Sequence, residues 1–262
     1  KQISTFDMEY IRNFEYRGLW GSKQVLWHNI NEDVNILVGI NGAGKTTLLN
    51  LIYEYYTKYQ ASSHKISVSS VYHATETLIP VAFIRSFDVP SNAKKNTNSP
   101  LYETLSKVVY QNNERKSFFD YRMRALNYKD QAPRVERRIE ELFYIINDFF
   151  AETKKKIEFD LDNNKLVFRT KDGDLLSLDK LSAGEKQLML ILLTVFLMDE
   201  EQYVLLMDEP ELSLHIEWQS KLIKALRKLN KNCQLIITTH SPSIFASGWQ
   251  NKLVYMDEIV EE

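Results

Sequence analysis

Residues 39–46 constrain the fold of this chain more than any other segment. Their sequence, Gly-Ile-Asn-Gly-Ala-Gly-Lys-Thr, fits the pattern G-x-x-x-x-G-K-[ST]. An apolar run at 34–38 predicts a strand before the segment, and a helix of about residues 45–58 is expected after it. Glycines allow a loop so tight that successive backbone N–H groups point at phosphate oxygens, and the following helix adds its positive N-terminal end. The segment therefore predicts a phosphate-binding loop.

The side chains of this loop predict its ligands. Lys45 is long enough to reach the β- and γ-phosphates of a nucleotide, where it is also expected to act in catalysis, and a threonine hydroxyl at position 46 is a Mg²⁺ ligand. We therefore expect ATP and Mg²⁺ to bind. The loop residues expected to contact the nucleotide are Asn41, Gly42, Ala43, Gly44, Lys45, Thr46 and Thr47.

A second segment places two acids at the end of a predicted strand. Residues 203–207 are apolar and are followed by Asp208 and Glu209. The carboxyl end of a strand in a parallel sheet opens into the crevice where ligands bind. Asp208 is therefore expected to hold Mg²⁺ through water, and Glu209 to orient and deprotonate an attacking water. Two acids at a strand end also occur for structural reasons alone, and it is their combination with the loop that indicates nucleotide hydrolysis.

Residues 181–187, Leu-Ser-Ala-Gly-Glu-Lys-Gln, begin a long predicted helix. Ser182 and Glu185 fit Ser-x-x-Glu, so one interpretation is a capping box that only stabilises the start of the helix. The other interpretation is that Ser182 and the Gly184 N–H present a second helix N-terminus to a γ-phosphate. The residues alone leave both interpretations open.

The order of the predicted elements indicates the fold class. From about residue 181, helices and strands alternate, which favours a mostly parallel α/β sheet with helices on both faces. We predict an α/β core formed by 1–90 and 157–262, split by a helical insertion at 91–156. The predicted strands are 8–11, 24–27, 34–38, 66–71, 78–84, 203–207, 234–238 and 252–255, with a hairpin at 157–168; the last insertion helix spans 133–156 and a later helix spans 214–229.

Composition excludes several classes of protein. The 262 residues are 44% hydrophobic and 26% charged, with a net charge of −2, as in an ordinary globular protein. The single cysteine, Cys233, rules out an internal disulfide framework and a cysteine-rich metal site. The longest apolar run, 188–198, is well short of the ~20 residues that cross a bilayer, and the first residues form no apolar signal region. We therefore expect a cytoplasmic chain with no membrane association.

Four motifs resemble those of ABC-type P-loop ATPases and occur in the same order. They are the loop at 39–46, Leu-Ser-x-Gly-Glu at 181–185, the acids at 208–209, and His240 after residues 236–239. The resemblance implies an ABC-ATPase head of the α/β class, with an N-terminal antiparallel β region beside a mostly parallel sheet. It also implies a homodimer, or a higher even-numbered oligomer, in which two chains pack head to tail around ATP.

The same resemblance implies roles for residues of both chains. The residues of one chain that would hold ATP and Mg²⁺ are Lys45, Thr46, Asp208 and Glu209. The Leu-Ser-x-Gly-Glu motif of the other chain would close on the γ-phosphate through Ser182 and Gly184, and Glu185 is expected to contact the nucleotide with them. His240 matches the switch histidine, which contacts the γ-phosphate or the attacking water, so it is expected to be catalytic. Residues 211–213 match a loop that touches the opposite subunit.

Details of the motifs resemble the soluble branch of these ATPases. Residues 208–215, Asp-Glu-Pro-Glu-Leu-Ser-Leu-His, resemble RecF, SMC and Rad50-like proteins, and most of all the OLD and Septu-type antiphage-defence ATPases. The 137 residues from Lys45 to Ser182 are too many for a compact transporter subunit and too few for the long coiled coil of an SMC protein. Arg12 and Asn13 lie in a segment that resembles the edge near the adenine, so we expect them to contact the nucleotide.

The chain departs from the pattern of the family in two places. ABC-type ATPases usually have a glutamine at the end of the strand predicted at 78–84, where it contacts Mg²⁺ and water. Residues 83–88 contain none, so Ser86 or Asp88 would take its place. OLD proteins continue into a Toprim nuclease domain, whereas 22 residues follow His240 in this sequence. We therefore expect a separate effector subunit, and the Septu resemblance points to an HNH-type nuclease.

Three alternatives stay open. One is a RecF-type DNA-repair ATPase, because residues 94–156 contain 14 basic and 9 acidic residues and offer a face for DNA phosphates. The arginines expected there are Arg122, Arg124, Arg134, Arg137 and Arg138. Acidic residues alternate with them, so a solvated or partner-binding face is the other interpretation. The remaining alternatives are a transporter ATPase subunit and a nucleotide sensor that scarcely hydrolyses ATP.

Overall fold

The chain divides into two compact units whose segments alternate along the sequence. The first unit consists of 1–86, 201–211 and 231–262, and the second of 87–200 and 212–230. The computed structural model describes residues 9–19, 22–61, 71–85, 99–110 and 117–261.

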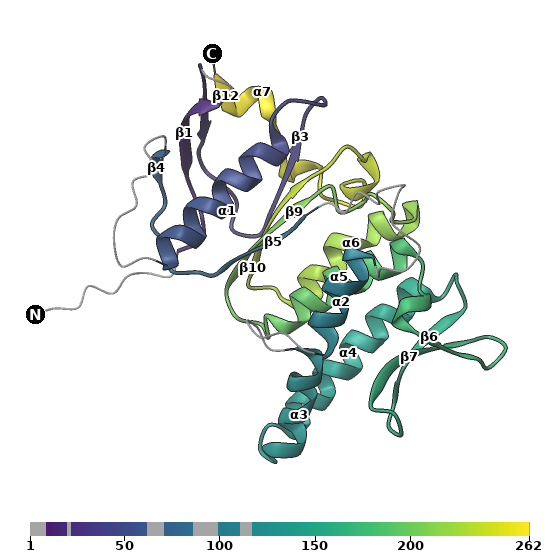
Figure 1. Cartoon of the computed structure of the whole chain (residues 1–262). Helices are drawn as coiled ribbons and strands as arrows, with labels where there is room; N and C mark the ends of the chain where they lie inside the picture. The colour runs from purple at the N-terminus through teal and green to yellow at the C-terminus, as the bar shows by residue number, and fades with distance from the viewer. Residues whose placement is uncertain (1–8, 20–21, 62–70, 86–98, 111–116, 262) are drawn as a thin grey trace, which may run out of the picture. The chain divides into compact units, whose positions relative to one another are not determined.

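A parallel sheet lies at the centre of the first unit (Figure 1). Its strand order is β11–β3–β10–β9–β5, and every neighbouring pair is parallel. Strand β10 is buried along its whole length, as expected for a strand covered on both faces, and this explains its continuous apolar sequence. The strands are β3 (Val34–Val38), β5 (Val81–Ile84), β9 (Tyr203–Asp208), β10 (Cys233–Thr238) and β11 (Leu253–Tyr255).

The first unit also contains an antiparallel sheet. Its order is β12–β2–β1–β4, and short helix α7 (Met256–Ile259) leads into its edge strand. In β2, Val25 and Trp27 are buried and alternate with partly exposed residues, the pattern of a sheet with one face on the core. The strands are β1 (Phe14–Leu19), β2 (Lys23–Trp27), β4 (Val71–Ala74) and β12 (Val260–Glu261).

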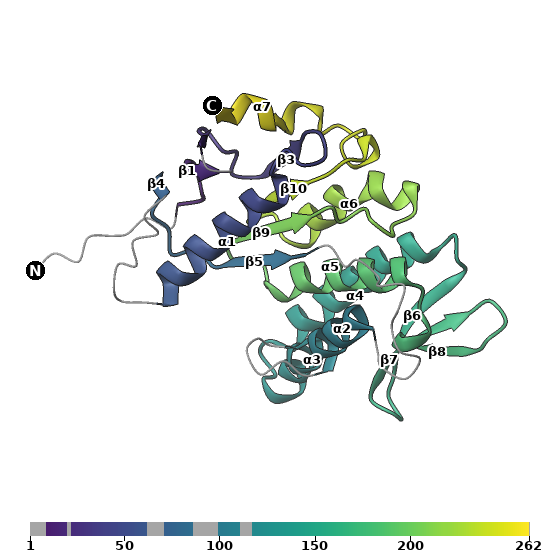
Figure 2. The ribbon, with the colours of Figure 1, turned by 45° about the horizontal axis from the view of Figure 1, so that its top comes forward.

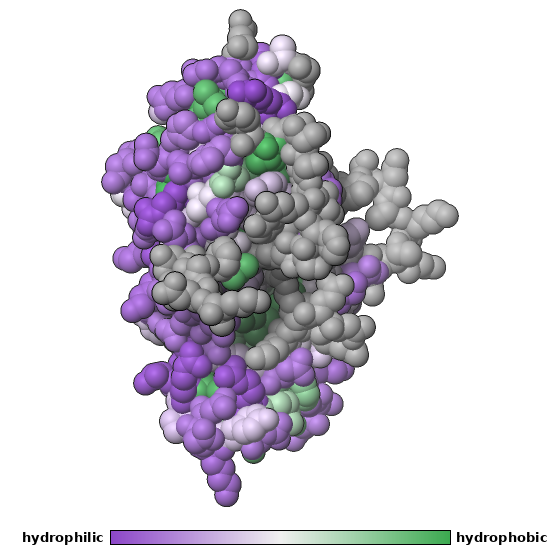
Figure 3. Space-filling view, turned by 90° about the vertical axis from the view of Figure 1, so that its left-hand side faces the viewer, coloured by the Kyte–Doolittle hydropathy of each residue, from purple (hydrophilic) through white to green (hydrophobic). Residues whose placement is uncertain are grey.

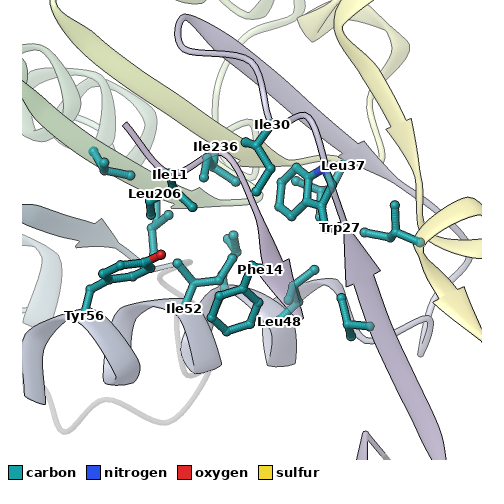
Figure 4. Close-up of a cluster of buried hydrophobic side chains, with 14 of the residues drawn as sticks. Ile11, Phe14, Trp27, Ile30, Leu37, Leu48, Ile52, Tyr56, Leu206 and Ile236 are labelled. Atoms are coloured by element: carbon teal, nitrogen blue, oxygen red, sulfur yellow. The ribbon is translucent and has the colours of Figure 1, made fainter. Parts of the chain in front are cut away.

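Helix α1 (Lys45–Ala61) contributes the side chains that join these two sheets into one core. Figure 4 shows its inner face packed against residues of both sheets. The side chains that meet there, each at most 2% exposed, are Leu48, Ile52, Tyr56, Phe14, Trp27, Leu37, Leu206 and Ile236. Burying one such side chain contributes about 1.5–3 kcal/mol. The core therefore holds the first turn of α1, and with it the end of the predicted phosphate loop.

Helices make up most of the second unit (Figure 2). They are α2 (Pro100–Tyr110), α3 (Phe118–Asn127), α4 (Ala132–Phe150), α5 (Ala183–Leu197) and α6 (Ile216–Leu229). Helix α5 contacts the other four and is buried on nearly all sides, which accounts for its almost unbroken apolar sequence. A small antiparallel sheet lies beside α4 and consists of β6 (Lys155–Asp160), β7 (Lys165–Thr170) and β8 (Leu175–Ser177).

The predicted α/β class is confirmed, and the differences concern the ends of elements. The strand predicted at 8–11 is not confirmed: residue 8 lies outside the described residues, residues 9–11 are not in a strand, and β1 begins at Phe14. The Arg12 and Asn13 N–H groups that precede β1 donate to the Thr75 hydroxyl. The helix predicted to reach residue 156 ends at Phe150, because residues 155 and 156 pair with β7 in the hairpin.

Other predictions about the organisation of the chain are not tested. The predicted strand residues 66–70 lie outside the described residues. Helices α2, α3 and α4 lie within 91–156, and the compact unit that contains them also includes α5 and α6. The division into a core of 1–90 and 157–262 and an insertion of 91–156 stays a prediction.

Two arginines predicted to contact DNA are paired at the end of α5. Arg124 Nη1 and Arg134 Nη1 donate to the carboxylate of Asp199 at 2.9 and 3.2 Å, and the Tyr121 hydroxyl donates to the same carboxylate at 2.9 Å. These contacts join α3 and α4 to the residue that follows α5. Both arginines are therefore paired with a carboxylate inside the second unit.

The other three predicted DNA contacts differ in their surroundings. Arg138 is 3% exposed and donates to the backbone oxygen of Leu229 at 2.8 Å, so it is a structural residue. The Arg122 guanidinium lies 3.8 Å from the ring centre of Phe159, whereas Arg137 is exposed. The five arginines do not form one exposed basic face, and DNA binding through them receives no support.

Within the part of the chain that the structure describes, no helix has the length and apolar character needed to cross a bilayer. Figure 3 shows the side of the molecule that lies to the left in Figure 1, where hydrophilic residues make up most of the described surface.

The Asp199 cluster predicts a stability effect that depends on pH. Burial raises the pKa of the Asp199 carboxyl, but the hydrogen bonds from Arg124, Tyr121 and Arg134 and the charge of Arg134 outweigh it, so the pKa is lowered. Such a group stabilises the fold above its ordinary pKa, and the contribution is lost as pH falls through the lower folded value. Asp199→Asn should therefore reduce the free energy of unfolding at pH 7 by about 1–3 kcal/mol.

Urea unfolding at a series of pH values from 7 to about 3 measures this effect. The stability of Asp199→Asn should fall less steeply below about pH 4 than that of the unmodified chain. Asp130→Asn, at an exposed position, is the matched control. Equal acid dependence in all three proteins would contradict the role of the cluster.

Candidate functional site

The predicted phosphate loop has the backbone that its glycines make available. Gly42 and Gly44 have φ angles of 81° and 90°, in the left-handed region that glycine adopts without strain. Asn41 and Gly42 are exposed, and Ala43 is half-buried and donates its N–H to the Ile40 oxygen at 3.1 Å. Helix α1 begins directly after the loop, so its first N–H groups face the loop without partners in the helix.

Lys45 lies inside this loop. It is 5% exposed, and its Nζ atom donates to the backbone oxygens of Gly39 and Ile40 at 2.8 and 3.2 Å. Burial lowers the pKa of Lys45, and the negative charges of Glu209, Asp208 and Glu211 only partly offset this. The loop thus holds a cation that is influenced by the charges of the acids at and after the end of strand β9.

Thr46 and Asp208 form the pair expected to hold a metal ion. The Thr46 hydroxyl lies 3.0 Å from both carboxylate oxygens of Asp208, and the Thr238 hydroxyl donates to Asp208 Oδ1 at 2.6 Å. Thr46 is exposed, whereas Asp208 and Thr238 are buried. Hydroxyl and carboxylate oxygens are the donors that Mg²⁺ prefers, so the residues present fit this ion.

Glu209 and His240 lie side by side at the ends of β9 and β10. Glu209 Oε1 is 3.1 Å from His240 Nε2, and the two side chains are 24% and 37% exposed. Glu209 has a φ of 44°, and its N–H is held by the backbone oxygen and the hydroxyl of Thr238, each at 3.1 Å. Non-glycine residues in this conformation cluster at functional sites, where the surrounding structure holds them in place.

The predicted site residues of the second unit surround the start of α5. The Glu185 N–H donates to the Ser182 hydroxyl at 3.2 Å, and the Ser182 N–H donates to the Glu185 carboxylate at 2.9 Å. The capping box is therefore present. Lys155 Nζ donates to both oxygens of the same carboxylate, at 2.7 and 2.9 Å. Burial raises the pKa of Glu185, but the contacts with Lys155 and Ser182 outweigh it, so the pKa is lowered.

These contacts separate the three residues by accessibility. Glu185 is 2% exposed and its carboxylate is satisfied within the unit, and Gly184 is also buried, whereas Ser182 is exposed. The prediction that these residues meet a nucleotide on another chain stays a prediction. The Glu185 carboxylate is buried, and the Glu185 N–H already donates to the Ser182 hydroxyl.

Gly184 has a steric reason to be glycine. A Cβ atom at this position would lie 2.2 Å from the backbone oxygen of Ser213, a distance that no side chain tolerates without movement of the backbone. Ser213 itself has a φ of 104°. The first turn of α5 is therefore packed directly on Ser213, one of the residues that the motif resemblance had assigned to contact with the opposite subunit.

The remaining predicted contacts lie in the first unit. Thr47 is exposed in the first turn of α1. Arg12 is exposed and forms an ion pair with Glu32, while the Asn13 side-chain oxygen accepts the Asn29 N–H at 3.4 Å. Their expected contact with the adenine stays a prediction. The two substitutes suggested for the family's glutamine, Ser86 and Asp88, lie outside the described residues.

Sequence reasoning did not assign two residues that the structure brings into the site. Thr238 bonds both Asp208 and Glu209, and Glu211 bonds the loop that carries His240. A threonine that ends the strand beside β9 was a usable signal for the first. Glu211 follows a proline and gave no signal of an inward-facing carboxylate.

In the second unit the structure brings together three further groups that could hold a metal ion. Ligand atoms of Glu152, His215 and Glu217 lie within 4.8 Å of one another, and all three residues are exposed. Their spacing in the sequence gave no metal prediction. Exposed groups of this kind are common without an ion, and we assign no metal to them.

Comparison with known families identifies the class of protein that this fold and site define. Residues 70–246 match the family AAA_21, described as "AAA domain, putative AbiEii toxin, Type IV TA system". The match includes Ser182, Asp208, Glu209 and His240. The chain is a P-loop ATPase of the ABC type, and it belongs to the AAA_21 family.

Curated relatives and solved structures agree with this assignment. The chain is 22% identical over 306 residues to the Septu protein PtuA of Bacillus thuringiensis, covering 94% of this chain and 76% of PtuA. It is 22% identical over 243 residues to protein ea59 of Escherichia phage lambda, covering 81% of this chain and 46% of ea59. The predicted similarity to Septu-type ATPases is thus confirmed.

Among solved structures, the fold is similar to that of the SmcHead bound to the C-winged helix domain of ScpA. The TM-score is 0.54 at 13% identity, covering 91% of this chain and 92% of that chain. This similarity confirms the predicted ABC-type head fold.

The position of Lys45 predicts the effect of removing it. Lys45→Ala should weaken the binding of Mg²⁺–ATP by about 10–100-fold, because charge-assisted hydrogen bonds to phosphate are lost. Isothermal titration calorimetry measures the affinity. Lys58→Ala, at an exposed position in the last turn of the same helix, should leave it unchanged. Undiminished affinity in Lys45→Ala would contradict the phosphate-loop assignment.

Proposed function

We propose that this chain binds ATP with Mg²⁺ and hydrolyses it in a head-to-tail homodimer, and that this cycle controls a separate effector subunit. The observation that supports hydrolysis most directly is the Glu209 carboxylate, 3.1 Å from His240, at the end of the strand that also holds Asp208. A carboxylate oriented by an imidazole has the properties of a general base.

The chain's own residues divide the work of hydrolysis. The loop N–H groups and Lys45 bind the phosphates. The position of the Lys45 side chain within the loop supports this role. Thr46, and Asp208 through water, would hold Mg²⁺, which when bound would neutralise phosphate charge. Glu209 accepts the proton of the attacking water, and His240 keeps that carboxylate in its orientation.

The proposal of a dimer is based on the motif at the start of α5. Ser182 is exposed at a helix N-terminus, and its hydroxyl and the free N–H groups of the first turn can bind an anion supplied from outside the unit. We propose that Ser182 and Gly184 of one chain meet the γ-phosphate held by the other. The γ-phosphate then links the two chains until it is cleaved. Assembly beyond the dimer, in even numbers, follows the same contact.

The effector rests on similarity to the Septu protein, which covers most of both chains. We propose that the ATPase acts in antiphage defence and restrains or licenses an effector carried on a separate chain, an HNH-type nuclease. A RecF-type role on DNA is not favoured, because Arg124, Arg134 and Arg138 are engaged inside the second unit.

Replacement of the general base should uncouple binding from hydrolysis. Glu209→Gln should bind Mg²⁺–ATP with unchanged affinity and hydrolyse it at least ~10²-fold more slowly, because the amide cannot accept a proton. Phosphate release and calorimetric titration measure the two properties. Glu103→Gln, an exposed glutamate of α2, is the matched control and should match the unmodified rate. If Glu209→Gln turned over at that rate, another residue would be the base.

The assembly is tested by the native mass of Glu209→Gln, which should trap the ATP-bound form. Expressed with its neighbouring genes and purified with Mg²⁺–ATP, it should contain an even number of ATPase copies together with a nuclease. Adding Ser182→Arg should leave monomer binding of ATP intact and yield single ATPase copies, because the larger side chain blocks the helix end. A mass that ATP does not change would refute the dimer, and a bare dimer that captures DNA would refute the effector role.

A further inference from the structure

Glu211 is a buried carboxylate that the proposed mechanism does not use. It lies three residues after the end of β9 and is 7% exposed. Its Oε1 atom accepts hydrogen bonds from the Thr239 hydroxyl, from the His240 N–H at 2.9 Å and from the Ser241 N–H at 3.3 Å. One oxygen therefore receives donors from three consecutive residues of the loop after β10.

The three donors differ in their surroundings. Thr239 is 1% exposed, His240 is exposed and Ser241 is half-buried, and the Ser241 N–H also donates to the Thr239 hydroxyl at 2.9 Å. A carboxylate that accepts N–H groups forms strong, charge-assisted hydrogen bonds. The backbone at position 240 is thus positioned by a side chain that belongs to the segment after β9.

His240 is consequently held twice by the same segment. Its ring lies 3.1 Å from the Glu209 carboxylate, and its backbone donates to the Glu211 carboxylate two residues further on. The contact through the backbone does not depend on the protonation or the rotamer of the ring. The backbone contact fixes the position of the His240 backbone, and the contact with Glu209 fixes the orientation of the ring.

We propose that Glu211 is a positioning residue of the ATPase site, whose carboxylate holds the loop 239–241 so that the His240 ring stays beside Glu209. This inference rests on the proposed hydrolysis. It gives Glu211 a role within its own chain, whereas the motif resemblance had placed residues 211–213 against the opposite subunit.

The second oxygen of Glu211 takes no part in holding the loop. Within the described part of the chain, Oε2 is buried and makes no hydrogen bond, which is unfavourable for a carboxylate. A glutamine offers one carbonyl oxygen for the same three donors, so holding the loop requires the length of the side chain and not its charge. The charge of Glu211 has a separate effect, since it is among those that partly offset the lowering of the Lys45 pKa by burial.

Two matched variants separate the effect of side-chain length at position 211 from the effect of its charge. Glu211→Gln keeps an acceptor at the right distance and loses the charge. Glu211→Asp keeps the charge and withdraws the acceptor by about one C–C bond, roughly 1.5 Å. If positioning is the role, Gln should preserve the site and Asp should damage it. Both variants retain a polar group of similar size, so each is expected to fold; Glu211→Ala is the more severe third variant.

The experiment combines amide hydrogen exchange with steady-state ATPase kinetics on the whole chain. The amide of residue 240 should exchange faster in Glu211→Asp and Glu211→Ala, and at the unmodified rate in Glu211→Gln, whereas the Ser241 amide also donates to the Thr239 hydroxyl and is a weaker reporter. The kcat of Glu211→Asp and Glu211→Ala should fall at least about tenfold with little change in KM for ATP. The phosphate loop, which binds ATP, is unchanged in these variants, whereas a misplaced His240 ring affects the chemical step. Gln should stay within about threefold of the unmodified kcat.

A double-variant comparison distinguishes positioning from general damage. In a His240→Ala background, Glu211→Asp should lower kcat no further, because its effect passes through His240. An equal loss in both backgrounds, or Gln as impaired as Asp, would overturn the proposal. If the unmodified chain showed no turnover, the proposed function would fail, and hydrogen exchange would still decide whether Glu211 holds the loop.

Discussion

The pairing of β9 with β10 at their carboxyl ends is the constraint on which the site depends. Asp208 lies opposite Thr238 in the parallel register and accepts its hydroxyl at 2.6 Å, and the next N–H, that of Glu209, donates back to Thr238. Because the two strands stop at the same level, the residues that follow each strand arrive together. A register shift of one residue would turn Asp208 to the other face of the sheet and separate the acids from His240.

The phosphate loop depends on the same sheet through packing. Strand β3 leads into the loop and pairs with β10, and the Thr239 N–H donates to Leu37 at 3.2 Å just before the loop begins. On its other side the loop continues into α1, whose inner face is locked into the core of the first unit (Figure 4). Both ends of the loop are therefore held by hydrophobic burial, so its shape does not require a ligand, which favours tight binding.

Local patterns in the sequence predicted the local structure around the candidate site, and long-range packing limited the rest. The loop, the acids at a strand end and the capped helix each need only a few adjacent residues to be recognised, and each is present. The partners of the arginines could not be predicted, since Asp199 is 75 residues from Arg124 and 65 from Arg134. The inward carboxylate of Glu211 was hidden for the same reason, because its partners follow a different strand.

The close packing of Gly184 on the Ser213 carbonyl has a consequence for natural variation. Two segments that the motif resemblance assigns to recognition of a second chain are, in the second unit, backbone neighbours. Any side chain at position 184 would require a shift of the Ser213 backbone. Inherited changes at this glycine are therefore expected to disturb the fold of the single chain, whereas changes at the exposed Ser182 would act on the proposed contact with a second chain.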